Sequence, residues 1–306
     1  MEYLLATEKL TKQFKQYKAV NEVNVHVRKG DIYGFIGRNG AGKTTFLKMV
    51  AGLSHPNSGE IMLFGYKGDG LVKHDVFSRI GTLIEAPGLY PKLSAYDNML
   101  LRCKLNGIKD KKVIQDLLSL VGLQAVAKKK VKTFSLGMKQ RLGIAIALIG
   151  EPELLVLDEP INGLDPQGIV EVRGILKKLN EERGITIIIS SHILEELTKV
   201  ANVFGVIHEG KLLKEFTMEE YNETATEHVE IKVDNVDKAK IALSEIGIKQ
   251  CDIVDHETIK VFEQLENSSK MASVLLDHGI ALKSINKERA SLEELYFTLT
   301  GGNANA

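Results

Sequence analysis

One run of residues in this chain has the types and spacing needed to hold a phosphate chain. Residues 37–45 read Gly-Arg-Asn-Gly-Ala-Gly-Lys-Thr-Thr and match the pattern G-x-x-x-x-G-K-[ST]. The glycines let backbone N–H groups turn toward an anion. Lys43 supplies a cation for the terminal phosphates, and Thr44 supplies a hydroxyl that can bind Mg²⁺. The pattern therefore predicts a nucleotide-binding loop whose contacts come from Gly37, Asn39, Gly40, Gly42, Lys43, Thr44 and Thr45.

The sequence around this loop has the strand–loop–helix order that the pattern requires. Residues 32–36 form an apolar run typical of a buried strand, and residues 46–52 follow with helical spacing and a closing glycine. The start of a helix adds unpaired N–H groups and the positive end of its dipole. This context favours phosphate binding over the alternative, a glycine-rich turn that carries Lys-Thr by chance.

Two carboxylates follow a second apolar run. Residues 154–157 are Leu-Leu-Val-Leu, and Asp158 and Glu159 come directly after them. A buried strand here would deliver Asp158 beside the phosphate loop, where it can hold Mg²⁺. Glu159 would then orient or polarise an attacking water. Taken alone, the run is equally consistent with a strand that enters an acidic turn.

The composition sets limits on the class of protein. The chain has 306 residues, of which 44% are apolar, so one large domain or two ordinary ones are expected. Lys+Arg and Asp+Glu are both 40, and this balance indicates no nucleic-acid partner. The two cysteines, Cys103 and Cys251, lie far apart, which suits a reduced cytosolic protein. No apolar run reaches the roughly 18–20 residues of a membrane span, so a role at a membrane would come through a partner.

Strands and helices alternate around these motifs, and this predicts a parallel sheet covered on both faces. Ser94, with Asp97, is expected to cap a helix, as is Asp165 followed by Pro166. A hairpin would complete a first domain over residues 1–216. The expected strands are 3–10, 20–28, 59–64, 153–157, 185–190, 203–208 and 211–216, and the expected helices are 94–106, 110–121 and 166–180.

The character of the chain changes after residue 216. Residues 217–227 are polar and charged and are expected to form a linker. An order βαββαβ plus a final helix then predicts a small ferredoxin-like domain over 228–299, and 300–306 is expected to be a disordered tail. The strands of this domain are expected at 228–233, 250–255, 257–263 and 281–286, and its helices at 236–246, 266–278 and 291–299.

Residues 134–138, Phe-Ser-Leu-Gly-Met, resemble the signature Leu-Ser-Gly-Gly-Gln of the ATP-binding cassette (ABC) family. Ser135 and Gly137 match it, whereas Leu136 and Met138 depart from it. In that family the segment completes the ATP site of the opposite subunit. Ser135 is also expected to cap the helix that follows, and a helix start with a serine hydroxyl can bind an anion. The resemblance therefore implies that Ser135 and Gly137 contact nucleotide held by a second copy of the chain.

Three further segments resemble motifs of the same family. Residues 162–165 are similar to its D-loop, which implies that Asp165 lies at a nucleotide-bearing dimer interface. His192 follows an apolar run and resembles the switch histidine that contacts the γ-phosphate. Phe14 stands where the family places a ring that stacks on adenine, with Tyr17 as the alternative.

Glu85 departs from the family, which usually has glutamine at this position. A carboxylate can ligate Mg²⁺, but it cannot donate a hydrogen bond as an amide does. Glu85, the following residues 86–91 and the form Ser-Leu-Gly-Met-Lys-Gln-Arg at 135–141 look like exporters of bacitracin-type and lantibiotic peptides.

The resemblance implies an α/β fold of the P-loop NTPase type. It would have a parallel core sheet, an antiparallel β subdomain and a helical subdomain, with the α+β domain following. It also implies ATP and Mg²⁺ as ligands, a homodimer, and a cytoplasmic location on the inner face of the membrane. Residues 85–93 would contact a separate permease. Two alternatives stay open: a soluble ABC ATPase without a transport role, and a regulatory subunit that does not hydrolyse ATP.

Overall fold

The chain forms two compact units, Met1–Met218 and Glu219–Ala306, in the computed structural model. The structure describes residues 3–224 and 227–301. Within these ranges no helix is long and apolar enough to span a bilayer. Each unit is described here by itself.

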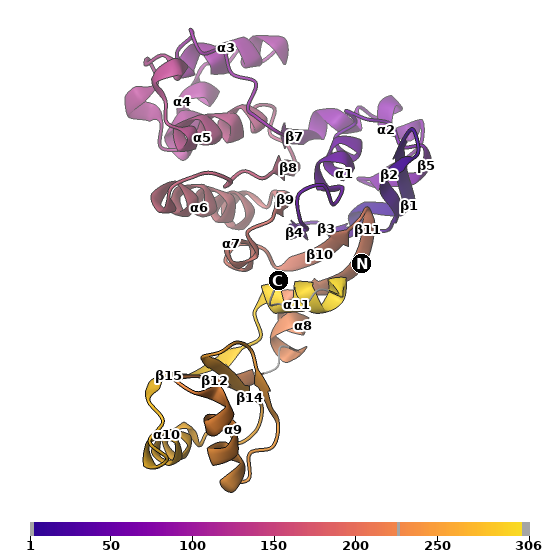
Figure 1. Cartoon of the computed structure of the whole chain (residues 1–306). Coiled ribbons are helices and arrows are strands. Elements are labelled where there is room, and N and C mark those ends of the chain that lie inside the picture. Colours follow the sequence, from indigo (N-terminus) through magenta and orange to yellow (C-terminus); the bar gives the residue numbers. More distant parts are fainter. Residues whose placement is uncertain (1–2, 225–226, 302–306) are drawn as a thin grey trace. The chain divides into compact units, whose positions relative to one another are not determined.

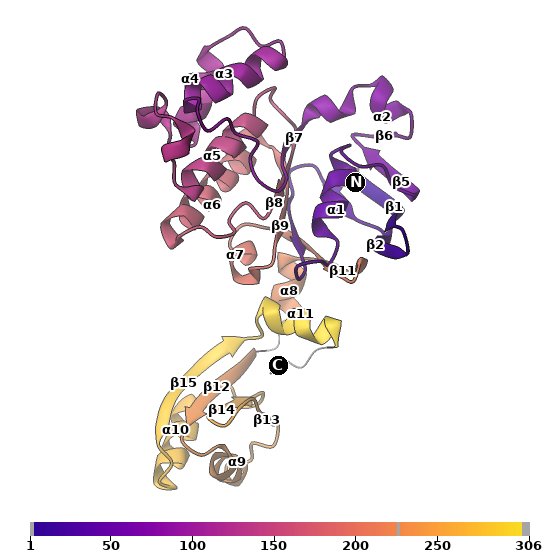
Figure 2. The same ribbon diagram turned by 45° about the horizontal axis from the view of Figure 1, so that its top comes forward.

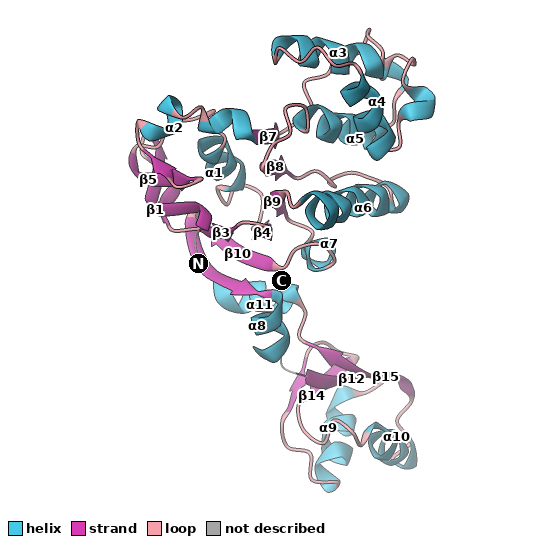
Figure 3. Cartoon of the chain, turned by 180° about the vertical axis from the view of Figure 1, so that it is seen from behind, coloured by secondary structure: helices cyan, strands magenta, loops and turns pink. Residues whose placement is uncertain are grey.

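A six-stranded sheet forms the centre of the first unit, in the order β11-β10-β4-β9-β8-β7. All neighbours are parallel except β10 and β11, which form the predicted antiparallel hairpin. Figures 1 and 3 show α1 (Lys43–Val50) and α6 (Pro166–Arg183) on opposite sides of this sheet. The prediction of a parallel sheet covered on both faces is therefore confirmed. Its strands are β4 (Ile32–Ile36), β7 (Ile80–Leu83), β8 (Leu154–Asp158), β9 (Thr186–Ser191), β10 (Val203–His208) and β11 (Lys211–Thr217).

A second, antiparallel sheet makes up the β subdomain. The prediction of one strand over 20–28 is wrong, because the chain turns at Asn24 and pairs with β1 twice. At this turn Asn24 Oδ1 accepts a hydrogen bond from Lys9 N at 2.7 Å, and Val25 N donates to Thr7 Oγ1 at 2.8 Å. At this turn, side-chain oxygens thus accept hydrogen bonds that backbone carbonyl oxygens accept in a regular sheet. The strands are β1 (Tyr3–Phe14), β2 (Tyr17–Val23), β3 (His26–Arg28), β5 (Ser58–Leu63) and β6 (Tyr66–Lys67), followed by the short helix α2 (Gly70–Lys73).

Three helices form the helical subdomain and gather together in Figure 1: α3 (Ala95–Leu105), α4 (Lys112–Leu120) and α5 (Leu136–Ala147). The two caps predicted for this subdomain are confirmed, since Ser94 Oγ accepts from Asp97 N at 3.0 Å and Ser135 Oγ accepts from Met138 N at 3.2 Å. A serine hydroxyl replaces the missing helical partner of an N–H at each start. A short helix, α7 (Leu194–Thr198), follows β9.

The second unit contains a four-stranded antiparallel sheet in the order β13-β14-β12-β15. Figure 2 shows α9 and α10 against this sheet, and their apolar residues share its core. The ferredoxin-like prediction is confirmed. Helix α8 occupies most of the segment expected as a linker; residues 225–226 of that segment and 302–306 of the expected tail lie outside the described residues. The elements are α8 (Met218–Thr224), β12 (Glu227–Val233), α9 (Val236–Glu245), β13 (Cys251–Ile253), β14 (Thr258–Val261), α10 (Ser268–Asp277), β15 (Leu282–Arg289) and α11 (Leu292–Thr300).

Candidate active site

The carboxyl ends of three parallel strands meet at one edge of the central sheet. Strand β4 leads into the phosphate loop, β8 ends at Asp158, and β9 ends at Ser191. Strand β9 lies between the other two. Ligands of open α/β sheets bind at this edge. The predicted loop and carboxylates are therefore brought together, with β9 between them.

The shape of the phosphate loop depends on two glycines. Gly42 has φ 109°, and a Cβ there would lie 2.3 Å from the carbonyl oxygen of Ala19. A Cβ on Gly37 would lie 2.6 Å from the carbonyl oxygen of Ile207. Both distances are shorter than atoms tolerate, so the backbone can take this path only without side chains at these positions.

Lys43 is buried and points back over the loop. Its Nζ donates to the carbonyl oxygens of Gly37 at 2.6 Å and of Arg38 at 3.3 Å. It also lies 3.2 Å from Glu159 Oε1. Its ammonium group is thus fixed at the centre of the loop, where a positive charge can face an anion.

Asp158 is buried, and both of its carboxylate oxygens are hydrogen-bonded. Thr44 Oγ1 donates to Oδ2 at 2.6 Å, and Ser190 Oγ donates to Oδ1 at 2.6 Å. Carboxylate and hydroxyl oxygens are the ligands that Mg²⁺ takes. The pair of Thr44 and Asp158 therefore fits the chemistry of a magnesium site.

Glu159 lies between a cation and an imidazole. Its Oε2 is 2.8 Å from His192 Nδ1, while its Oε1 is the atom that faces Lys43. Oε1 has no hydrogen bond within the described part of the chain, so the ion pair with Lys43 carries its contact. The backbone of Glu159 is left-handed, with φ 49°. Such a conformation costs free energy in a residue with a side chain and is concentrated at functional sites.

Ser190 is a member of this cluster that the sequence reasoning missed. It is fully buried, its hydroxyl donates to Asp158, and it accepts a hydrogen bond from Glu159 N at 3.0 Å. It lies opposite Asp158 in the parallel register of β8 and β9. The available signal was a small polar residue at the end of an apolar strand, two positions before His192.

A cavity of about 310 Å³ opens over the phosphate loop. Phe14 and Tyr17 both border it and are both more than half exposed, and the Tyr17 hydroxyl donates to Gly40 O at 3.3 Å. Both rings therefore border the space next to the phosphate loop. The lining is Phe14, Tyr17, Ala19, Arg38, Asn39, Gly40, Gly42, Lys43, Thr44, Thr45 and Glu159.

Ser135, Gly137 and Asp165 are absent from this lining. Ser135 caps α5, and Asp165 Oδ1 accepts from Gly168 N at 2.9 Å as the cap of α6, as predicted. The two helix starts pack together, since a Cβ on Gly137 would lie 3.8 Å from Leu164 Cδ2. One chain therefore does not bring these three residues to its own phosphate loop.

Glu85, the third predicted metal ligand, is engaged elsewhere. Its Oε1 lies 2.5 Å from Lys48 Nζ on α1, and its side chain is 65% exposed. Its backbone is left-handed, with φ 63°. The described contacts link Glu85 to Lys48 rather than to Thr44 or Asp158.

Comparison with known proteins identifies the family. Residues 20–162 match the family described as ABC transporter. The chain is 43% identical to the bacitracin transport ATP-binding protein BcrA of Bacillus licheniformis, over 99% of each chain. It is 42% identical to the uncharacterized ABC transporter ATP-binding protein YcbN of Bacillus subtilis (strain 168), again over 99% of each. The chain belongs to the ABC transporter family.

Solved ABC cassettes resemble the structure as well. A dimeric ATP-binding cassette, MJ0796, bound to ADP and Pi has a TM-score of 0.63 and 25% identity, covering 70% of this chain and 98% of that one. The cbiO1 subunit from Clostridium perfringens has a TM-score of 0.64 and 28% identity, covering 73% and 92%. This ABC chain is thus an ATP-hydrolysing subunit that energises a membrane permease. The alternatives without a transport role are not favoured, since two relatives that match over 98–99% of their length are bacitracin transport ATP-binding proteins by name.

Proposed function

We propose that two copies of this ABC subunit close around ATP and Mg²⁺ and drive the export of a peptide antibiotic through a permease. The observation that carries the proposal is the position of Glu159. Its carboxylate reaches both Lys43 and His192, and the residue before it in the chain is the buried Asp158.

Glu159 acts as the general base in this proposal. Its carboxylate accepts a proton from the attacking water, and His192 orients the carboxylate and the water. Lys43 now compensates the charge of Glu159 at 3.2 Å. When Lys43 turns to the phosphates, this ion pair breaks and Oε1 of Glu159 can face the attacking water. Nucleotide binding would then release the base.

The residues that line the cavity over the phosphate loop bind the nucleotide in this proposal. Backbone N–H groups of the loop and the start of α1 face the phosphates. Asn39, Gly40 and Thr45 border the same space, and Phe14 stacks on the adenine, with Tyr17 as the rival ring. Thr44 and Asp158 would hold Mg²⁺, which neutralises charge on the phosphates when bound. For Glu85 to join them, its carboxylate would have to leave Lys48.

The second copy supplies the other half of each site in this proposal. Ser135 offers a hydroxyl, Gly137 offers an N–H at the first turn of α5, and Asp165 lies beside them at the start of α6. A helix start with these groups suits the γ-phosphate of a nucleotide on the facing subunit. The separation of these residues from the loop within one chain supports this arrangement.

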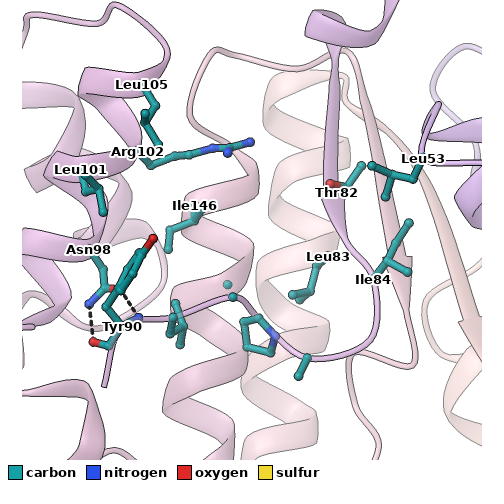
Figure 4. Close-up of a pocket in the computed structure, with 15 residues that line it drawn as sticks. Leu53, Thr82, Leu83, Ile84, Tyr90, Asn98, Leu101, Arg102, Leu105 and Ile146 are labelled. Atoms are coloured by element: carbon teal, nitrogen blue, oxygen red, sulfur yellow. Dashed lines mark hydrogen bonds between the residues drawn. The ribbon is translucent and has the colours of Figure 1, made fainter. Parts of the chain in front are cut away.

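The permease would dock at a groove of about 330 Å³ between the segment after β7 and helices α3 and α5 (Figure 4). Leu83, Ile84 and Ile146 give it an apolar floor, and Tyr90 stands at its edge, 56% exposed. Asn98 fixes Tyr90 by two hydrogen bonds, at 2.8 Å and 3.2 Å. An apolar groove beside a segment held by hydrogen bonds suits an apolar helix from a membrane subunit. Residues 85–93 would transmit the closure of the dimer to that helix.

The cargo class is proposed from the relatives. BcrA transports bacitracin by name, and the lantibiotic transport protein SrtF of Streptococcus pyogenes is 46% identical over 69% of this chain and 90% of its own. We propose a peptide antibiotic as the cargo and a place on the inner face of the membrane, held by the permease.

The test is Glu159→Gln in the full chain. The amide cannot accept the proton, so we expect ATP hydrolysis to fall by roughly 10²–10⁴-fold. ATP binding should persist, and dimers should accumulate because the closed state no longer turns over. Steady-state phosphate release and size-exclusion chromatography with ATP measure the two effects.

Glu195→Gln is the matched control, since this exposed carboxylate pairs only with Lys199 among its described ion pairs. Hydrolysis by this control should stay within twofold of the unaltered chain. Turnover by Glu159→Gln near that of Glu195→Gln would remove Glu159 from its role.

A further inference from the structure

Three side chains with metal-binding groups lie on one face of the sheet in the second unit. His228 and Glu230 are two positions apart on β12, so both point to the same face. Glu288 lies directly opposite His228 in the antiparallel register of β12 and β15. Their nearest ligand atoms all lie within 4.8 Å of one another.

This face is not the one that forms the core of the unit. Val229, Ile231 and Val233 alternate with His228 and Glu230 along β12 and pack in the core with α9 and α10. The cluster therefore lies on the opposite face of the sheet. Packing in the apolar core does not account for these three polar side chains.

The imidazole of His228 is buried without a polar partner. The residue is 1% exposed, and neither Nδ1 nor Nε2 is hydrogen-bonded within the described residues. The neighbouring ring of Phe262, with its centroid 5.8 Å away, offers no polar atom. A buried polar group without a partner is unfavourable, and such groups are rare in native proteins. The two ring nitrogens therefore have no competing partner among the described residues if the imidazole binds a ligand.

The nearby cations leave the carboxylates open to a ligand. Lys260 lies opposite Glu230 on β14, but its Nζ binds Glu294 on α11. Lys232 is 3.4 Å from Oε1 of Glu230, which leaves the second oxygen available. No ion pair of Glu288 is found among the described residues. Two carboxylates thus lie within 4.8 Å of an imidazole that has no hydrogen bond among the described residues.

We propose that His228, Glu230 and Glu288 bind a divalent transition-metal ion of the zinc class. Imidazole nitrogen and carboxylate oxygen are zinc ligands, whereas Mg²⁺ and Ca²⁺ prefer oxygen alone. Three protein ligands leave a fourth position for water. With metal–ligand bonds of about 2.0–2.2 Å, the side chains need only a small rotamer adjustment to converge on one ion.

The bound ion would join β12 to β15 and stabilise the unit. Both strands provide ligands, and the two carboxylates that repel each other in the free protein would share one cation. The phosphate loop contributes nothing to this site, so the ion is distinct from the magnesium of the ATP site.

The experiment uses the full chain after treatment with a chelator, without nucleotide and in excess Mg²⁺. Calorimetric titration with Zn²⁺ should give one ion per chain, and thermal unfolding should shift to higher temperature. Co²⁺ in place of Zn²⁺ should give ligand-field absorption without a thiolate charge-transfer band, because neither Cys103 nor Cys251 is a ligand.

Glu288→Gln should weaken Zn²⁺ binding at least tenfold and remove most of the thermal shift. This residue is exposed, so the variant is expected to fold. His228→Gln should abolish binding. The matched control is His278→Gln, because His278 is an exposed histidine of the same unit with one carboxylate, Glu245, at 3.2 Å; this variant should bind as the unaltered chain does.

Three results would overturn the proposal. The first is the absence of stoichiometric Zn²⁺ binding by the unaltered chain. The second is equal binding by Glu288→Gln and His278→Gln. The third is binding that survives in Glu288→Gln but is lost in Asp158→Asn, which would locate the ion at the ATP site instead.

Discussion

At the scale of single residues, Ser190 connects the two carboxylates of the site. Its hydroxyl donates to Asp158 and accepts from the backbone of Glu159, so one side chain orients both. Ser190→Ala would leave an oxygen of a buried carboxylate unpaired, and a hydrogen bond to a charged group contributes about 1.5–3 kcal/mol. We expect kcat to fall by roughly tenfold or more, with a smaller change in KM, in an ATPase assay.

Ser191→Ala is the matched control for this prediction. It lies on the same strand, but its hydroxyl bonds only to the backbone of Ile193 among the described contacts. If both variants lost the same activity, the effect would come from the strand rather than from the hydroxyl of Ser190.

At the scale of elements, the need for glycine in the phosphate loop comes more from the close approach of neighbouring backbone atoms than from positive φ angles. Gly40 and Gly42 have φ values of 83° and 109°. A Cβ on Gly40 would meet open space, whereas one on Gly42 would strike the carbonyl oxygen of Ala19 at 2.3 Å. Gly42→Ala should therefore weaken ATP binding at least tenfold in a fluorescent-nucleotide titration, because the loop must move away from β2.

Gly30→Ala serves as the control, because Gly30 is absent from the cavity lining, has φ 86° and would have open space around a Cβ. It carries only the cost of its backbone angle, about 1–2 kcal/mol. We expect it to lower stability but to bind ATP within a few-fold of the unaltered chain. Equal losses of ATP binding in the two variants would show that the close approach to Ala19 is not what weakens binding.

At the scale of the whole molecule, the proposed two-fold dimer shares each ATP site between two subunits. This arrangement predicts a result that is not expected if each subunit builds its site alone. Lys43→Ala removes the loop cation, and Gly137→Asp places a negative charge where the partner's phosphate would lie; each variant alone should be inactive. In a mixed dimer one site carries both changes and the other carries neither. An equal mixture should therefore recover roughly a quarter of the ATPase activity, because half the dimers are mixed and each has one intact site.

This measurement needs both variants purified separately and exchanged with permease and ATP present. Each variant kept alone through the same procedure is the control. Zero recovery in a mixture whose subunits have exchanged, as shown by crosslinking of two tags, would mean that each chain builds its own site.

Interactions between residues a few positions apart determined the motifs and the first residues of the helices, and these can be predicted from the sequence. The spacing of glycines before Lys43, the apolar run before Asp158 and the caps at Ser94, Ser135 and Asp165 depend on residues a few positions apart. Such patterns can be read from the chain because their interactions close within one turn or one loop. The order of strands and helices likewise predicted the central sheet of the first unit and the sheet of the second unit.

Only the tertiary structure decided the contacts between distant residues. The bond from Ser190 to Asp158, the reach of Glu159 to both Lys43 and His192, and the break in the strand at Asn24 depend on how strands pair. The burial of His228 opposite Glu288 has the same origin. A shift of one residue in register turns each side chain to the other face of its sheet, and the sequence alone does not contain that register in readable form.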